Sequence, residues 1–134
     1  MSLEPTQQPA NVPLRLAAEQ ATAQLLREVK GVKAVLVSTE DGFEVAAQVE
    51  NTAQVSRLSA MASSLAALGA LAGEESRLGA CDSLVMQATD GMIAILQIRR
   101  PDITLILSVV TGRDAIIGQV LYASRQMAQT LQKA

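Results

Sequence analysis

Three arginines at predicted turns are the residues of this chain whose type and position most resemble catalytic groups. Arg99 and Arg100 precede Pro101, and Arg113 precedes Asp114. An arginine presented from a turn can stabilise the charge that develops on a transferred phosphoryl group. Turn arginines are more often simply solvated, and Arg113 can pair with the neighbouring Asp114. The structural interpretation is therefore favoured over a catalytic one.

Two Asp-Gly pairs supply the remaining candidates, as carboxylates for a metal ion or for acid–base catalysis. Asp41-Gly42 and Asp90-Gly91 each lie between strand-like runs, where Asp-Gly is typical of a hairpin turn in which both turn positions have positive φ. No further ligand accompanies either pair, the chain has no histidine, and Cys81 is its one cysteine. Neither glycine-rich phosphate-binding motif occurs. The sequence thus predicts no catalytic residue, no metal site and no cofactor, and hence a protein that is not an enzyme.

Composition narrows the function further. The chain has 134 residues, enough for one domain, and is 49% hydrophobic with one Phe and one Tyr. The scarcity of aromatics and the net charge of −2 argue against nucleic-acid binding. A single cysteine fits a reducing compartment, no secretory signal is evident, and the unbroken apolar runs fall short of the ~20 residues of a membrane span. We expect a cytoplasmic protein without a membrane span.

The stretch 55–72 organises the elements that must position any functional surface. It is rich in Ala and Leu, has no charge after Arg57, and is predicted to be a helix. Its large side chains fall on one arc: Leu58, Met61, Leu65 and Leu68. A second arc holds small side chains: Ser59, Ser63, Ala66, Ala67 and Ala70. We expect the large arc to pack on the core and the small arc to face a second surface. The alternative is that the small arc packs within the same chain; contact with another molecule is favoured because the chain has few elements to cover it.

The remaining elements follow from hydrophobic periodicity and turn signals. Residues 1–13, with three prolines, are predicted to be a disordered lead-in to one domain over residues 14–132. The first helix is expected over 14–29. The second is expected over 53–72, with a cap at Asn51-Thr52 and an end at Gly73. The third is expected from a cap at Thr111 to about Leu131. Strands are expected over 33–39, 43–49, 80–89, 92–99 and 103–110.

This order, α-β-β-α-β-β-β-α, predicts an α/β (α+β) fold with a five-stranded antiparallel sheet between helices. The strands at 92–99 and 103–110 lack polar alternation, so both faces of the sheet must be covered, with the middle helix alone on one face. The strand at 80–89 is more polar and weaker, as an edge strand is. Pairing with the same strand of a second copy would satisfy its free edge and bring the two middle helices together.

The chain resembles the roadblock/LC7 family, whose fold is related to those of profilin and longin domains. The resemblance is carried by residues 31–37 leading into Asp41-Gly42-Phe43, by the Ala/Ser/Leu helix 53–72, and by the strands on either side of Asp90-Gly91 and at 105–107. It covers roughly residues 14–132. It implies a homodimer that pairs the third strand and packs the second helix against its copy, and a role as a light chain or as a partner of Ras-like GTPases.

These arguments together predict a homodimeric module that regulates or scaffolds a Ras-like small GTPase in bacterial signalling or motility. The alternative is a structural light-chain-type adaptor that leaves nucleotide turnover unchanged. The expected dimer interface combines the small arc with strand residues: Ser59, Ser63, Ala66, Ala67, Ala70, Cys81, Asp82, Ser83, Leu84 and Val85. The expected surface for a third protein is the outer rim of the helix: Gln54, Arg57, Ser64 and Leu71.

Overall fold

The structure, a computed structural model, describes residues 12–49 and 53–134. Its elements follow the predicted order: α1 (Val12–Glu28), β1 (Val32–Thr39), β2 (Glu44–Gln48), α2 (Ala53–Glu75), β3 (Ser83–Ala88), β4 (Gly91–Arg99), β5 (Thr104–Gly112) and α3 (Ile117–Lys133). The fold class predicted from the sequence is confirmed. The predicted cap at Asn51-Thr52 and most of the predicted lead-in lie outside the described residues.

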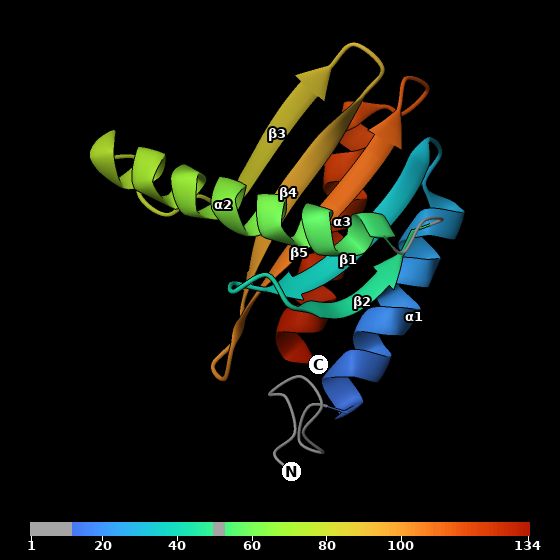
Figure 1. Ribbon diagram of the computed structural model, residues 1–134, viewed down its shortest axis with the longest axis horizontal. Coiled ribbons are helices and arrows are strands. Elements are labelled where there is room, and N and C mark those ends of the chain that lie inside the picture. The colour runs from blue at the N-terminus through green and yellow to red at the C-terminus, as the bar shows by residue number, and fades with distance from the viewer. Residues whose placement is uncertain (1–11, 50–52) are drawn as a thin grey trace.

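The five strands form one antiparallel sheet in the order β2-β1-β5-β4-β3. The hairpins β1–β2 and β3–β4–β5 pair as expected from their short turns. The two groups are joined by β1 and β5, in which Val35 lies opposite Val109 and Val37 opposite Leu107. This leaves β2 and β3 as the edge strands, so the predicted edge position of the third strand is confirmed (Figure 1).

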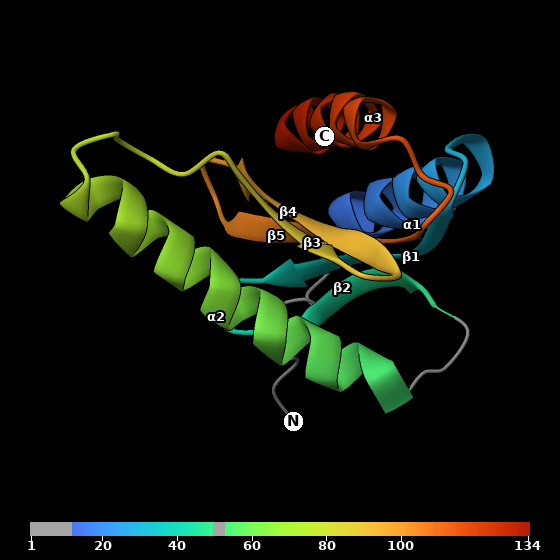
Figure 2. The ribbon, with the colours of Figure 1, turned by 90° about the horizontal axis from the view of Figure 1, so that it is seen from above.

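The sheet separates two layers of helix. α1 and α3 lie side by side on one face, and α2 crosses the other face alone (Figure 2). The larger core lies under α1 and α3, where side chains such as Leu25, Val37, Leu107 and Leu131 are buried. The core under α2 is smaller and is built on Ile95 and Ile106.

Several element boundaries differ from the prediction for local reasons. α1 begins at Val12, so residues 12 and 13 are helical rather than part of the lead-in. α2 continues through Gly73 to Glu75, because one glycine costs a helix only about 1 kcal/mol. Its missing side chain also leaves room for the Gly79 carbonyl, which a Cβ at position 73 would overlap.

The predicted cap at Thr111 is wrong, because this residue belongs to the sheet. Thr111 is buried in β5, and its hydroxyl accepts a hydrogen bond from the Met92 N–H at 3.2 Å. α3 begins instead at Ile117, preceded by Ile116 in an extended conformation without a side-chain cap. β3 is shorter than predicted as well, so Cys81 and Asp82 precede it.

The hairpin turns use glycine differently from the prediction. Gly42 has a φ of +90°, in the left-handed region, and its N–H donates to the Thr39 carbonyl at 3.0 Å. Asp41 and Asp90 do not have positive φ; among the described residues, Arg77 is the one non-glycine that does. The expected turns with positive φ at both central positions are therefore absent at these two sites.

α2, from Gln54 to Glu75, is the one helix of the described residues that is long and apolar enough to cross a membrane by length and composition alone. The prediction from unbroken apolar runs missed it because isolated Ser and Gly residues interrupt those runs without making the helix polar. Length and apolar composition are weak evidence for a span, since a helix that packs within a soluble domain has them too. α2 lies flat across the sheet (Figure 2).

Arg100, in the β4–β5 turn, caps the C-terminal end of α3. Its guanidinium Nη1 donates to the carbonyl oxygens of Leu131 at 2.6 Å and Ala134 at 2.7 Å, while Nε donates to Asp102 at 3.0 Å. The hydrogen bond from Arg100 lowers the pKa of Asp102 below its ordinary value. The Arg100 side chain is 11% exposed, and its bond to the Leu131 carbonyl is partly buried. These bonds anchor the last turn of α3 to the sheet.

Replacing Arg100 tests this cap. We expect Arg100→Ala to lower the free energy of unfolding by about 2 kcal/mol, because several hydrogen bonds from one charged donor, itself largely buried, are lost together. Arg99→Ala is the matched control, since Arg99 is 44% exposed and pairs with an exposed Asp82; its loss is expected to cost less than about 1 kcal/mol. Urea denaturation at a fixed protein concentration measures both. Equal effects of the two substitutions would contradict the capping role.

Candidate interaction surface

α2 contacts the sheet through its small side chains. Its buried residues recur at a spacing of three and four: Val55, Ser59, Ala62, Ala66 and Gly69. Ala62 and Ala66 pack on the bulky Ile95 and Ile106 of the sheet. At Gly69 a Cβ would lie 3.0 Å from the Cys81 sulfur, so only glycine fits there without a shift. Small residues let the helix lie close to a sheet surface that is itself bulky.

This packing contradicts the predicted roles of the two arcs at several residues. Ser59 and Ala66, expected to contact a second copy, are 1% and 6% exposed and face the chain's own sheet. Met61 and Leu68, expected to be buried, are 52% and 61% exposed. Within the large arc, Leu65 is half-buried and packs against the core as predicted, so each predicted arc is divided between the two environments. The prediction failed because it assigned the inward face by side-chain size, whereas the bulky sheet surface favours small partners.

The other predicted interface residues lie in three places. Ser63 is half-buried, and its hydroxyl donates to the Glu40 carbonyl, which ties α2 to the β1–β2 turn. Ala67 and Ala70 are exposed on the same flank of the helix as Ser63. The strand residues lie at or next to the open edge of the sheet: Cys81, Asp82, Ser83, Leu84 and Val85.

All four residues predicted to face a third protein are exposed. Gln54, Arg57, Ser64 and Leu71 lie along the outer side of α2, and Leu71 is 54% exposed. Since α2 extends past β3, its C-terminal turns lie beyond the edge of the sheet (Figures 1 and 2). The turns of α2 that follow Gly69, which still approaches Leu84 of β3, therefore form a helix end with no sheet beneath it.

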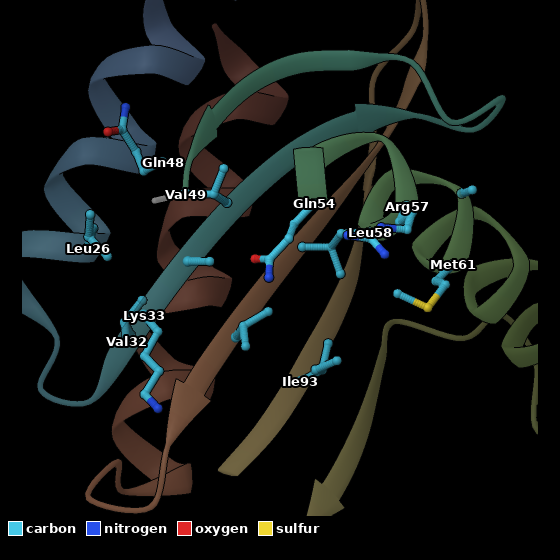
Figure 3. Close-up of a pocket in the computed structure, with 13 residues that line it drawn as sticks. Leu26, Val32, Lys33, Gln48, Val49, Gln54, Arg57, Leu58, Met61 and Ile93 are labelled. Atoms are coloured by element: carbon cyan, nitrogen blue, oxygen red, sulfur yellow. The ribbon is translucent and has the colours of Figure 1, made fainter. Parts of the chain in front are cut away.

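A groove of about 1350 Å³ runs along the other flank of α2, over the part of the sheet that the helix leaves uncovered (Figure 3). Ala34, Ile93 and Val110 contribute from the sheet. Gln54, Arg57, Leu58 and Met61 contribute from α2, and Lys33 contributes from β1. The groove is thus mostly apolar, with two cationic side chains among its lining residues.

Sequence reasoning missed Lys33, Ile93 and Val110, because residues from separate strands meet here only through the β1–β5–β4 pairing. Met61 and Leu58 were identified as a group but assigned to the core. One signal in the sequence could have located the groove. The strands place apolar residues on the face of the sheet that carries α2, and a single helix is too narrow to cover all of them.

The arginines considered as catalytic groups all have partners within the chain. Arg99 pairs with Asp82 at 3.4 Å, Arg113 pairs with Asp90 at 3.5 Å, and Arg100 caps α3. Over residues 12–49 and 53–134, no cluster of His, Cys, Asp or Glu could hold a metal ion.

Comparison with known proteins bears on the fold. No protein-family model and no curated protein matches the sequence. The roadblock/LC7 domain from Streptomyces avermitilis has a TM-score of 0.78 at 17% identity, over 86% of this chain and 94% of that one. The gliding protein MglB from Thermus thermophilus gives 0.79 at 17% identity, and an MglB with a tetrameric arrangement gives 0.81 at 18%; each likeness covers 98% of this chain and 96% of the other. At these identities the likeness concerns the fold, and it covers nearly the whole chain.

Arginine substitutions on the two arcs of α2 test which arc faces the sheet. Ala66→Arg is expected to lower the free energy of unfolding of the single chain by about 2 kcal/mol or more, because a long charged side chain must enter a packed contact. Leu68→Arg is expected to change it by less than about 0.5 kcal/mol, since Leu68 is exposed. Thermal melts followed by circular dichroism, at a concentration where both variants are monomeric, give the comparison. A silent Ala66→Arg would contradict the observed orientation.

Proposed function

Because the chain has the roadblock/LC7 fold, we propose that it is a homodimeric protein-interaction module that regulates or scaffolds a Ras-like small GTPase. The module acts through contact, with no catalytic residue, cofactor or metal of its own, and is located in the cytoplasm. The observation that carries the proposal is an apolar helix end lying beyond an open sheet edge.

The open edge supports dimerisation through β3. β3 pairs with β4 alone, so the backbone groups on its outer side have no strand partner in the described part of the chain. Such an edge pairs readily with another strand. A two-fold axis perpendicular to the sheet would join β3 to its copy and continue the sheet across both protomers. Both copies of α2 would then lie on the same face.

The exposed apolar side chains of α2 support the same arrangement. Met61, Leu68 and Leu71 are each more than half exposed, as is Leu78 just after the helix. Covering them in an interface would contribute roughly 1 kcal/mol each. The proposed interface therefore keeps the strand residues Ser83, Leu84 and Val85, but takes the large arc of α2 in place of Ser59 and Ala66, which are buried under the helix.

The outward side of the paired helices is the proposed surface for the GTPase. Ser64 is exposed midway along α2, and Gln54 continues this surface toward the N-terminal end of the helix, whereas Arg57 and Leu71 lie where this surface meets the dimer contact. The alternative, a light-chain-type adaptor, uses the same surface to hold a partner without changing nucleotide turnover. Binding to a cognate GTPase is common to both, and the hydrolysis and exchange rates separate them.

Light scattering combined with size-exclusion chromatography tests the dimer. We expect a dimer at micromolar concentration and a shift toward monomer for Leu68→Arg, because the charge must be desolvated in an apolar contact. Ser56→Arg, an exposed position near the other end of α2, serves as the control and should remain dimeric. A monomeric wild-type chain would refute the proposed dimer.

The GTPase role is tested with a Ras-like small GTPase from the same organism. We expect the wild-type dimer to bind it, and binding to weaken at least about tenfold for Ser64→Arg, because a long charged side chain at this exposed position obstructs the contact with the GTPase. Single-turnover hydrolysis and nucleotide exchange are measured with and without the dimer. Binding without a change in either rate would favour the adaptor, and no binding would refute the GTPase role.

A further inference from the structure

We infer that the groove beside α2 receives the C-terminal end of α2 from a second copy, held there by an ion pair between Arg57 and the partner's Glu75. The inference rests on the proposed dimer. It adds to that dimer the place where the free helix end binds and the charges that fix its position. The groove, with its apolar floor and two cations, is the one shown in Figure 3.

The two-fold axis of the proposed dimer lies where α2 meets β3. Leu65 of α2 and Leu84 of β3 pack against the same buried cluster, and a Cβ at Gly69 would lie 4.0 Å from the Leu84 side chain. An axis that pairs β3 with its copy near Leu84 therefore passes beside residues 65–69 of α2. The two helices then run antiparallel and are closest at this point, on the flank that borders the groove.

The register of the helix pair then brings opposite charges together. Arg57 and Glu75 lie equally far along α2 on either side of Ala66, at about 13 Å for a rise of 1.5 Å per residue. Antiparallel pairing about that point places each Arg57 opposite the partner's Glu75. Met61 and Leu68 lie between these two residues on the same side of the helix at helical spacing, so the contact between the charged ends is apolar.

The groove and the helix end also match in chemistry. The lining residues of the groove include Lys33 and Arg57 and no acidic residue, while the helix end carries Leu68, Leu71 and then Glu75. Within the described residues, Lys33, Arg57 and Glu75 make no ion pair inside the chain. The last turn of α2 has no basic residue, and a carboxylate there opposes the helix dipole. A cation from the second copy relieves that repulsion.

Charge reversal tests the pair. Arg57→Glu and Glu75→Arg are each expected to raise the dimer Kd on the order of tenfold, because each creates two like-charge contacts per dimer. The double variant Arg57→Glu/Glu75→Arg is expected to return the Kd to within about threefold of wild type, since both pairs are restored with reversed sign. Analytical ultracentrifugation across a dilution series gives each Kd. The wild-type Kd should also rise as NaCl is increased from about 0.05 M to about 0.5 M.

Glu74→Arg is the matched control. Glu74 lies next to Glu75 but on the flank shared by Ala67 and Ala70, away from the groove, and its reversal should leave the Kd within about twofold. If the wild type is dimeric but the double variant is no tighter than the single variants, the ion pair is refuted and the proposed dimer stands. If Glu74→Arg weakens the dimer as much as Glu75→Arg, the helix end does not lie in the groove. A monomeric wild type refutes both proposals.

Discussion

The fit between small residues of α2 and bulky residues of the sheet determines the surface of this molecule. Ile95 and Ile106 rise from the sheet where the helix crosses it, and Ala62 and Ala66 allow the helix to approach. Since a face of small side chains on α2 makes this contact, the large side chains of Met61 and Leu68 are turned outward. The exposed leucines, the groove beside the helix and the apolar end beyond β3 all follow from that one choice of face.

Much of the fold could be predicted from the sequence. Hydrophobic periodicity and the Asp-Gly turns gave the order of elements, the antiparallel hairpins and the layer of α2 opposite α1 and α3. The pairing of β1 with β5 could not be derived this way, because no local signal links strands so far apart in the chain. Strand and helix ends were misplaced where tertiary contacts dominate, as at Thr111, whose hydroxyl is held by the sheet.

The candidate site was predicted less well, for a physical reason. A helical period shows which residues share a face of α2, but the inward face depends on the surface that it meets. For this reason Ser59 was predicted to face outward and Leu68 to face the core, and the structure has the opposite arrangement. Exposed charges such as Arg57 were placed correctly, since charge alone keeps them in water. Lys33 was not anticipated in the same groove as Arg57, because the two residues line it together only when β1 takes its central place in the sheet.

The strand order also has a consequence for how the chain folds. The hairpins β1–β2 and β3–β4–β5 can form from neighbouring residues, whereas joining β1 to β5 closes a loop of about half the chain. Closing such a loop costs entropy before its contacts form, which slows folding. α2 lies within this loop and contacts strands of both groups, so part of the surface it rests on is missing until the loop is closed. Slow pairing of β1 with β5 would therefore prolong the time during which apolar side chains of α2 lack their full native contacts and can aggregate.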